Sequence, residues 1–362
     1  MRKRLLAGLF FAALLLYNGT GAQAESARAA LLMEAETGRI LYEKNAHEPL
    51  PMASTTKVMT ALLALEHAAL SDTVTAGKNA FGVPGTSIYL TEGEQLSMEE
   101  MLYGLMLCSG NDAAVAIAEH VAGSVDSFCH LMTLRAEQIG CENTIFSTPH
   151  GLPANHHHTT AYDLALITRE ALQNPDFRQI VSTQRATIPW AGHTENRVLN
   201  NKNALLSTYE GALGVKTGYT KAAGRCLAFA AERDGMTVIG CVLNAPNWFE
   251  DAREIMDAAF AKYQMHTLLE KGETVRTLPV ENGEKVQLSI LAGKALSAPT
   301  EKGTFPDIVF DLPESLTAPI EKGQLVGTAS LLDEHQLLST IPLYAAESVR
   351  EVSFRFHLTR LF

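Results

Sequence analysis

The segment at residues 50–62 reads Leu50-Pro51-Met52-Ala53-Ser54-Thr55-Thr56-Lys57-Val58-Met59-Thr60-Ala61-Leu62. Val58 and Leu62 have the spacing of one buried helix face, so we predict a helix over residues 54–66. Ser54 and Lys57 form an S-x-x-K pattern at its start, and residues three apart share a helix face. A serine hydroxyl needs a base, and a lysine can serve if burial or a second cation lowers its pKa. The segment therefore predicts a serine nucleophile with a lysine base.

Two further motifs follow in order along the chain. Ser109 and Asn111 form an S-x-N pattern in the break between two predicted helices, and Lys216-Thr217-Gly218 is a K-T-G pattern at a strand end. Lys216 is the candidate second cation for the lysine base, and Asn111 can hold a substrate amide. Thr217 can bind a carboxylate while a peptide lies along the strand edge. Each pattern alone is weak, but the three in order on suitable elements point to one active site.

The elements around these motifs predict a sheet with helices packed against it. In chain order, the predicted elements are a hairpin of two strands, a long block of helices, further strands and a closing helix. A capping box at Ser97 to Glu100 opens one of the helices. The predicted strands are 29–33, 40–42, 214–216, 225–231 and 236–243, and the predicted helices are 54–66, 97–107, 111–121, 160–173 and 251–263.

The residue pattern of the chain changes near residue 265. Short strand-like runs separated by glycines follow, which is typical of a small all-β module. We therefore predict one domain over residues 25–264, a β domain over 265–345 and a tail over 346–362. The strand-like runs lie at 275–278, 286–291, 308–312 and 325–330.

Residues 1–24 have the pattern of a secretory signal peptide. Residues 2–4 are basic, residues 5–17 are apolar, and residues 22–24 read Ala-Gln-Ala. Thirteen apolar residues are too few to cross a bilayer, which needs about 20, although an uncleaved anchor stays an alternative. The sequence thus predicts an exported protein on the outer face of the cell membrane or in the cell-wall space.

The composition of the chain limits which binding partners and cofactors we expect. The formal net charge is −11, which disfavours nucleic acid, because phosphate binding relies on lysine and arginine. The five cysteines have no metal-ligand spacing, so we expect small buried side chains, with a Cys226–Cys241 disulfide as the alternative. Adjacent histidines at 156–158 cannot all face one ion, so we expect a polar surface loop there. No metal or organic cofactor is predicted.

With these motifs in place, the sequence resembles the low-molecular-mass D-alanyl-D-alanine carboxypeptidases, the serine penicillin-binding proteins of peptidase family S11. The resemblance implies an α/β (α+β) fold of the serine β-lactamase and transpeptidase type, with an antiparallel sheet, a helical cluster and a small all-β C-terminal domain. It covers nearly the whole mature chain. It rests on the stretches 50–62, 108–114, 150–152, 160–165, 214–220 and 319–327.

The resemblance also implies a role for each motif residue. Ser54 would be acylated, Lys57 would activate it, and Ser109 would relay a proton. Substrate binding would fall to Asn111, Lys216, Thr217, Gly218 and Tyr219, with the backbone N–H groups of Ser54 and Tyr219 forming the oxyanion hole. The substrate would be a peptidoglycan pentapeptide ending in D-Ala-D-Ala, and penicillins would acylate the same serine.

Three alternatives use the same motifs: a β-lactamase, a D,D-endopeptidase and a penicillin-binding sensor that does not turn over. No counterpart is found for the glutamate that activates water in class A β-lactamases. Some family members place an arginine near the position of Trp248, where the nearest cation here is Arg253. Carboxylate binding would then fall on Lys216, Thr217 and Thr220. The tail alternates like a strand, yet its apolar and cationic groups also suit a membrane surface.

Overall fold

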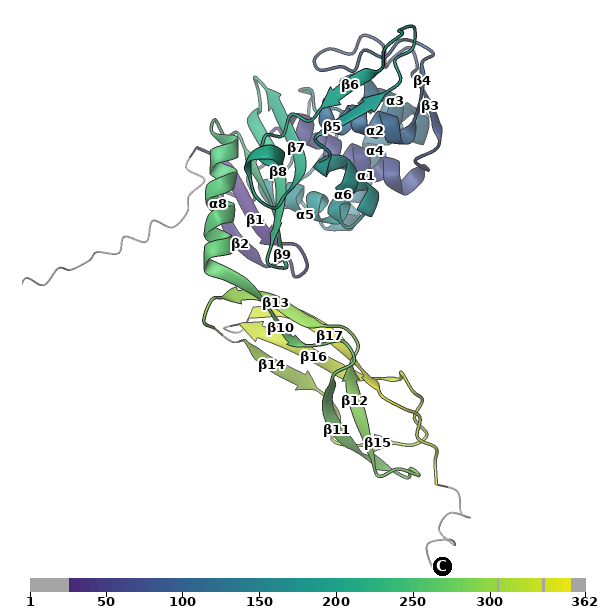
Figure 1. Cartoon of the computed structure of the whole chain (residues 1–362), viewed down its shortest axis with the longest axis vertical. Coiled ribbons are helices and arrows are strands. Elements are labelled where there is room, and N and C mark those ends of the chain that lie inside the picture. The colour runs from purple at the N-terminus through teal and green to yellow at the C-terminus, as the bar shows by residue number, and fades with distance from the viewer. Residues whose placement is uncertain (1–25, 305, 334–335, 353–362) are drawn as a thin grey trace, which may run out of the picture.

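The computed structural model describes residues 26–304, 306–333 and 336–352 (Figure 1). The predicted signal peptide at 1–24 and the tail from 353 onward lie outside the described residues. The chain forms two lobes joined end to end, and the smaller lobe is built entirely of strands. The predicted fold class, a mixed domain with an antiparallel sheet followed by a small all-β domain, is confirmed.

The first lobe is organised around a five-stranded antiparallel sheet in the order β2-β1-β9-β8-β7. The N-terminal strand β1 lies inside the sheet, and all its residues are buried because both sheet faces are covered. Strand β7, which carries the K-T-G motif, lies at one edge of the sheet. It pairs with β8 on one side, and among the described residues no strand of this sheet pairs with its other side. The strands are β1 (Ala29–Glu34), β2 (Ile40–Lys44), β7 (Ala212–Thr220), β8 (Gly224–Arg233) and β9 (Met236–Leu243).

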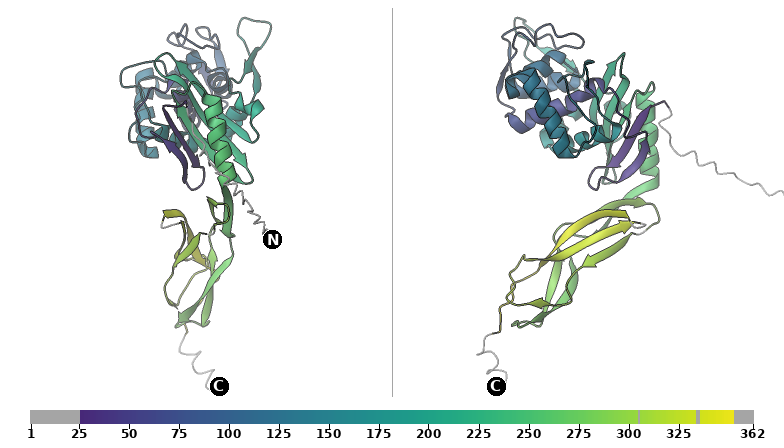
Figure 2. Two further views of the ribbon diagram at one scale, coloured as in Figure 1. Left: turned by 90° about the vertical axis from the view of Figure 1, so that its left-hand side faces the viewer. Right: turned by 180° about the vertical axis from the view of Figure 1, so that it is seen from behind.

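Helices cover both faces of this sheet, as Figure 2 shows. One helix, α8 (Trp248–Lys262), packs on one face, and a cluster of helices packs on the other. The cluster consists of α1 (Lys57–His67), α2 (Met98–Leu107), α3 (Asn111–Ala122), α4 (Val125–Ile139), α5 (Ala161–Leu172) and α6 (Pro175–Ser182). Smaller elements lie in its loops, namely β3 (Thr73–Thr75), β4 (Gln95–Ser97), β5 (Arg185–Ile188), β6 (Arg197–Asn200) and the short α7 (Leu205–Thr208).

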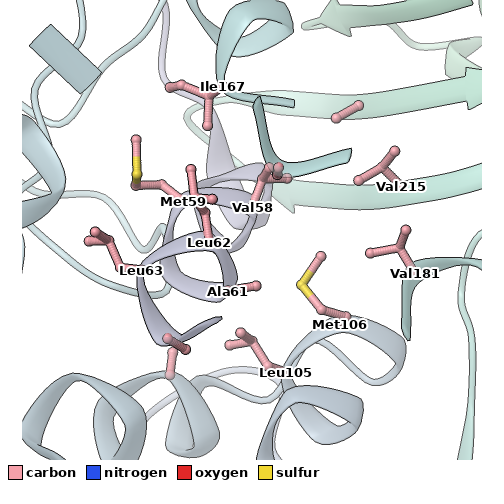
Figure 3. Packing of buried hydrophobic residues seen from close by; sticks show 14 of the residues in the cluster. Val58, Met59, Ala61, Leu62, Leu63, Leu105, Met106, Ile167, Val181 and Val215 are labelled. Atoms are coloured by element: carbon pink, nitrogen blue, oxygen red, sulfur yellow. The ribbon is translucent and has the colours of Figure 1, made fainter. Parts of the chain in front are cut away.

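Helix α1 lies at the centre of the larger core (Figure 3). Its first eight residues are all buried, so this part of the helix is enclosed on every side rather than on one face, and it includes the polar Lys57 and Thr60. The predicted start at Ser54 needs a correction: a 3₁₀ turn, η1 (Ala53–Thr56), precedes α1, which begins at Lys57. Ser54, the predicted nucleophile, therefore lies in the tight turn that leads into the helix. Helical spacing cannot distinguish these two conformations over one turn, because the backbone hydrogen bond spans three residues in a 3₁₀ turn and four in an α-helical turn.

Local capping signals predict helix starts well. Ser97 accepts a hydrogen bond from the Glu100 backbone N–H, and Glu100 accepts one from the Ser97 N–H, so the predicted capping box is confirmed. Thr160 caps α5 in a similar way by accepting from the Asp163 N–H. These bonds satisfy backbone donors that a helix cannot satisfy internally.

The β lobe contains a six-stranded sheet in the order β14-β16-β17-β12-β11-β15 and a separate β10-β13 pair. The strand-like runs predicted from the sequence do not include β10, β13, β15 or β17. Strand β10 continues directly from α8, and β17 is the longest strand of this lobe. The strands are β10 (Tyr263–Leu269), β11 (Thr274–Glu281), β12 (Gln287–Ala292), β13 (Leu296–Glu301), β14 (Asp307–Asp311), β15 (Leu316–Thr317), β16 (Leu325–Asp333) and β17 (Gln336–Ala345).

Polar contacts at the end of α8 and at Arg39 help to join the lobes. Lys262 at the end of α8 pairs with Glu301 at 2.6 Å, and the Arg39 guanidinium donates to the Pro299 carbonyl at 2.7 Å. Among the described helices, we find none with the length and apolar character needed to cross a membrane.

All five cysteines are free thiols. Four are buried and Cys108 is partly buried, which matches the expected role as small core side chains rather than the alternative disulfide. Burial raises the pKa of Cys226 to about 12, so this thiol stays protonated at neutral pH.

Candidate active site

The nucleophile candidate lies in a strained turn. Ala53, directly before Ser54, has a φ of 49°, a left-handed conformation that costs most side chains energy. The turn is held by Thr56, whose Oγ1 donates to the Ala53 carbonyl at 2.8 Å, and by Thr55, which donates to the Met52 carbonyl at 2.6 Å. These bonds fix both the hydroxyl and the backbone N–H of Ser54.

Lys57 is completely buried and points at three oxygen atoms. Its Nζ lies 3.0 Å from Ser54 Oγ, 2.7 Å from Asn111 Oδ1 and 2.7 Å from the His150 carbonyl. Burial, followed by the charge of Lys216, lowers its pKa well below the ordinary lysine value. In the neutral form, two N–H groups satisfy Asn111 and His150, which leaves the nitrogen lone pair toward Ser54 Oγ. This arrangement suits a general base.

The S-x-N turn brings Asn111 into contact with Lys57. Ser109 has a φ of 65°, so both serines of the motifs lie at or next to a left-handed residue. The Asn111 side chain uses Oδ1 to accept from Lys57 and Nδ2 to donate to the Pro84 carbonyl at 2.6 Å. Thr86 donates to the Ser109 carbonyl, so the loop before β4 supports the turn from the other side.

The K-T-G strand runs beside Ser54. A Cβ atom on Gly218 would lie 2.8 Å from the Ser54 backbone nitrogen, so only glycine allows this approach. Lys216 is buried, and burial followed by the charge of Lys202 lowers its pKa to about 7. Thr217 is nearly buried, whereas Tyr219 is 63% exposed at the mouth of the site. Edge strand β7 thus lines the site opposite η1.

The loop at residues 150–158 forms another wall. Burial, followed by the charge of Lys57, lowers the pKa of His150 to about 3, so this ring stays neutral near Lys57. The expectation of a surface loop at 156–158 is wrong for His157, which is 7% exposed. His157 Nδ1 accepts from the Ser147 N–H at 3.0 Å, so its Nε2 donates to Thr56 Oγ1 at 2.9 Å. His157 thereby supports the turn that carries Ser54.

Gly151 makes the closest backbone approach in this wall. Its φ is 88°, and a Cβ there would lie 1.8 Å from the Ala53 carbonyl oxygen. We expect Gly151→Ala to lower the free energy of unfolding by at least about 2 kcal/mol more than Gly123→Ala. Gly123 is a matched control, because its φ is 74° but nothing lies within 4 Å of its Cβ position. Urea unfolding of both variants measures the difference, and equal losses would contradict the argument.

His157 also predicts a pH dependence of stability. Burial, followed by the charge of His158, lowers the pKa of His157 to about 4. The unfolded chain then binds the proton more readily, so stability falls as pH drops from about 6.5 toward 4. We expect His157 to account for about 3 kcal/mol of that loss. Unfolding curves of wild type and His157→Gln at several pH values test this, and parallel pH profiles would refute it.

A third cation, Lys202, acts on the two buried lysines although it lies outside the three motifs. Lys202, just after β6, is exposed, and its charge lowers the pKa of both Lys216 and Lys57. Arg253, the cation considered from the sequence, is engaged elsewhere: it donates to Thr208 Oγ1 at 2.6 Å and lies 3.6 Å from Glu250. The Trp248 ring is instead faced by Arg225 at 5.7 Å.

The structure brings the three motifs together from three separate parts of the chain. Direct contacts link Ser54, Lys57 and Asn111, and Gly218 abuts the Ser54 backbone. Sequence reasoning missed the supporting role of His157 and the position of Lys202. A buried histidine inside a run of three gives no local signal, and a lone lysine outside any motif gives none either.

Comparison with known proteins gives consistent matches over most of the chain. A family model described as D-alanyl-D-alanine carboxypeptidase, peptidase S11, matches residues 18–247, and one described as penicillin-binding protein 5, C-terminal domain, matches residues 263–351. The chain is 34% identical over 353 residues to D-alanyl-D-alanine carboxypeptidase DacF of Bacillus subtilis, covering 94% of this chain and 90% of that protein. It is also 34% identical to DacC of Escherichia coli, covering 91% and 85% respectively.

Solved structures are similar as well. Penicillin-binding protein 5 from Haemophilus influenzae superposes with a TM-score of 0.76 at 28% identity, covering 90% of this chain and 98% of that one.

Proposed function

Because this chain belongs to the D-alanyl-D-alanine carboxypeptidases of peptidase family S11, it is a serine-type hydrolase of that specificity, and we propose that Ser54 is its acylated nucleophile. The observation that carries this proposal is the position of Lys57, buried with its amine 3.0 Å from Ser54 Oγ. A base of lowered pKa within hydrogen-bond reach of a hydroxyl is what nucleophilic catalysis requires.

The reaction begins with a peptidoglycan stem peptide that ends in D-Ala-D-Ala. Lys57 Nζ takes the Ser54 hydroxyl proton while Oγ bonds to the carbonyl carbon of the penultimate D-alanine. The resulting oxyanion accepts from the backbone N–H groups of Ser54 and Tyr219, which stabilise charge that develops only in the transition state. The C–N bond then breaks, and the leaving D-alanine amine takes a proton relayed from Lys57 through Ser109.

Water completes the cycle. It attacks the acyl-enzyme ester with its proton passing to the base, and Ser54 regains its hydroxyl as the shortened peptide leaves. Asn111 holds the substrate backbone, while Lys216 and Thr217 bind the terminal carboxylate. A β-lactam acylates Ser54 by the same first step, since its strained amide takes the place of the D-Ala-D-Ala bond.

Release of D-alanine from an N-acylated peptide ending in D-Ala-D-Ala tests this function. We expect purified mature protein to release D-alanine and to gain the mass of one penicillin on Ser54. A penicillin adduct without D-alanine release would support a sensor instead. Rapid penicillin hydrolysis would indicate a β-lactamase, and cleavage restricted to cross-linked peptides would indicate a D,D-endopeptidase.

We further propose that the enzyme works outside the cytoplasmic membrane and contacts it through its tail. Support comes from the sequence alone: the signal-peptide pattern at 1–24 and the apolar and cationic residues within 346–362. In cells, the mature N-terminus is expected at residue 25, with the protein in the membrane fraction. Removal of residues 353–362 should release it, and an unchanged distribution would contradict the role of the tail.

A further inference from the structure

Lys202 is held in a fixed position beside the S-x-N turn. Its backbone N–H donates to the Leu107 carbonyl at 3.3 Å, at the end of α2 and two residues before Ser109. The residues on both sides are tied down too: the Asn201 N–H donates to the Gln184 carbonyl at 2.8 Å, and Asn203 is buried. The backbone at Lys202 is therefore part of the frame of the site.

The side chain of Lys202 carries an uncompensated charge. It is exposed, and within the described part of the chain it makes no ion pair. After burial, its charge is the main cause of the lowered pKa of Lys216, and it acts on Lys57 as well. Lys202 is thus an exposed cation whose backbone is anchored to the end of α2, next to the S-x-N turn, and whose charge acts on both buried lysines.

Three lysines placed in this way disfavour one another's charged forms, and a bound anion would relieve that repulsion. The protein as a whole is anionic, so this local excess of positive charge stands against its average. Arg253 cannot provide the charge, because Thr208 and Glu250 already engage it.

We propose that Lys202 binds the terminal carboxylate of the substrate at the mouth of the site, as an additional residue that determines specificity. This inference rests on the proposed function, because it assigns a contact to the same substrate. Lys202 attracts the carboxylate from solvent, and Lys216 and Thr217 complete its binding inside. The preference for a free C-terminal carboxylate then follows from an exposed lysine outside the three motifs.

Two substrates with the same acyl group separate this role from the chemistry. One is an N-acylated peptide ending in D-Ala-D-Ala, and the other is a thioester in which an uncharged thiol replaces the terminal D-alanine. At a pH above the acid limb of both proteins, where Lys57 is neutral with or without the charge of Lys202, we expect Lys202→Gln to raise KM for the peptide about tenfold with kcat within about twofold, and to leave thioester cleavage unchanged. Lys202→Arg should keep most of the peptide affinity, because it keeps the charge.

Lys271→Gln is the matched control, since it removes one exposed lysine in the β lobe, away from the site. Added salt should raise KM for the peptide more in wild type than in Lys202→Gln. An equal loss of kcat/KM on both substrates would mean that Lys202 only positions the S-x-N turn. An unchanged KM for the peptide would mean that Lys202 does not contact the substrate. Either result overturns this proposal and leaves the proposed function intact. A wild-type protein inert toward both substrates would overturn the proposed function itself.

Discussion

Replacement of Ser54 by alanine is expected to abolish D-alanine release, with kcat/KM reduced by a factor of at least about 10⁴. The reason is that Ser54 supplies the hydroxyl that faces the base: among the described residues, Lys57 Nζ contacts Ser54 Oγ at 3.0 Å, and its other two hydrogen-bond partners are an amide oxygen and a backbone carbonyl oxygen, which cannot form an acyl-enzyme. The same variant should gain no mass when incubated with a penicillin. D-alanine release and intact-protein mass spectrometry measure the two effects.

The Ser54 variant should fold normally. Ser54 is partly exposed, and the turn around it is held by Thr55 and Thr56 rather than by its own hydroxyl. Its midpoint of thermal unfolding should therefore match that of Ser207→Ala, a control at an exposed serine of α7. Retained D-alanine release in a folded Ser54→Ala protein would place the nucleophile elsewhere.

Lys57→Gln should lower the rate of Ser54 acylation by about 10³, in the range that general bases contribute. Glutamine fits a similar space and can still bond Asn111 and His150, but it cannot take a proton from Ser54 Oγ. Acylation by a penicillin under single-turnover conditions measures the loss, with Lys271→Gln as the control for removal of one lysine.

The pH profile gives this prediction a sharper form. Lys57 acts as a base only when neutral, and burial with the charge of Lys216 lowers its pKa. Wild-type acylation should therefore increase with pH on the acid side until Lys57 is deprotonated, whereas the residual rate of Lys57→Gln should lack that limb. A rising limb retained in the variant would assign the base to another group.

Short-range pattern was sufficient for several features of this protein. The i, i+3 spacing of Ser54 and Lys57 places both on one side of the chain in either a 3₁₀ or an α-helical turn, so their contact follows although the predicted helix start was wrong. The capping box at Ser97 was likewise readable, because cap and partner are three residues apart. The family resemblance carried the fold class of both lobes.

The relative positions of residues far apart in the sequence could be known only from the folded structure. Sheet order puts β7 at the edge beside η1, so Gly218 meets Ser54 across more than 160 residues of sequence. The left-handed Ala53, the buried His157 and the exposed Lys202 leave no periodic signal, because each depends on what packs against it. The motifs thus predict which groups take part in the proposed reaction. Packing of the folded chain decides the rest: it holds Ala53 in a left-handed conformation beside Ser54, buries Lys57 so that its pKa falls, and places Lys202 near the S-x-N turn.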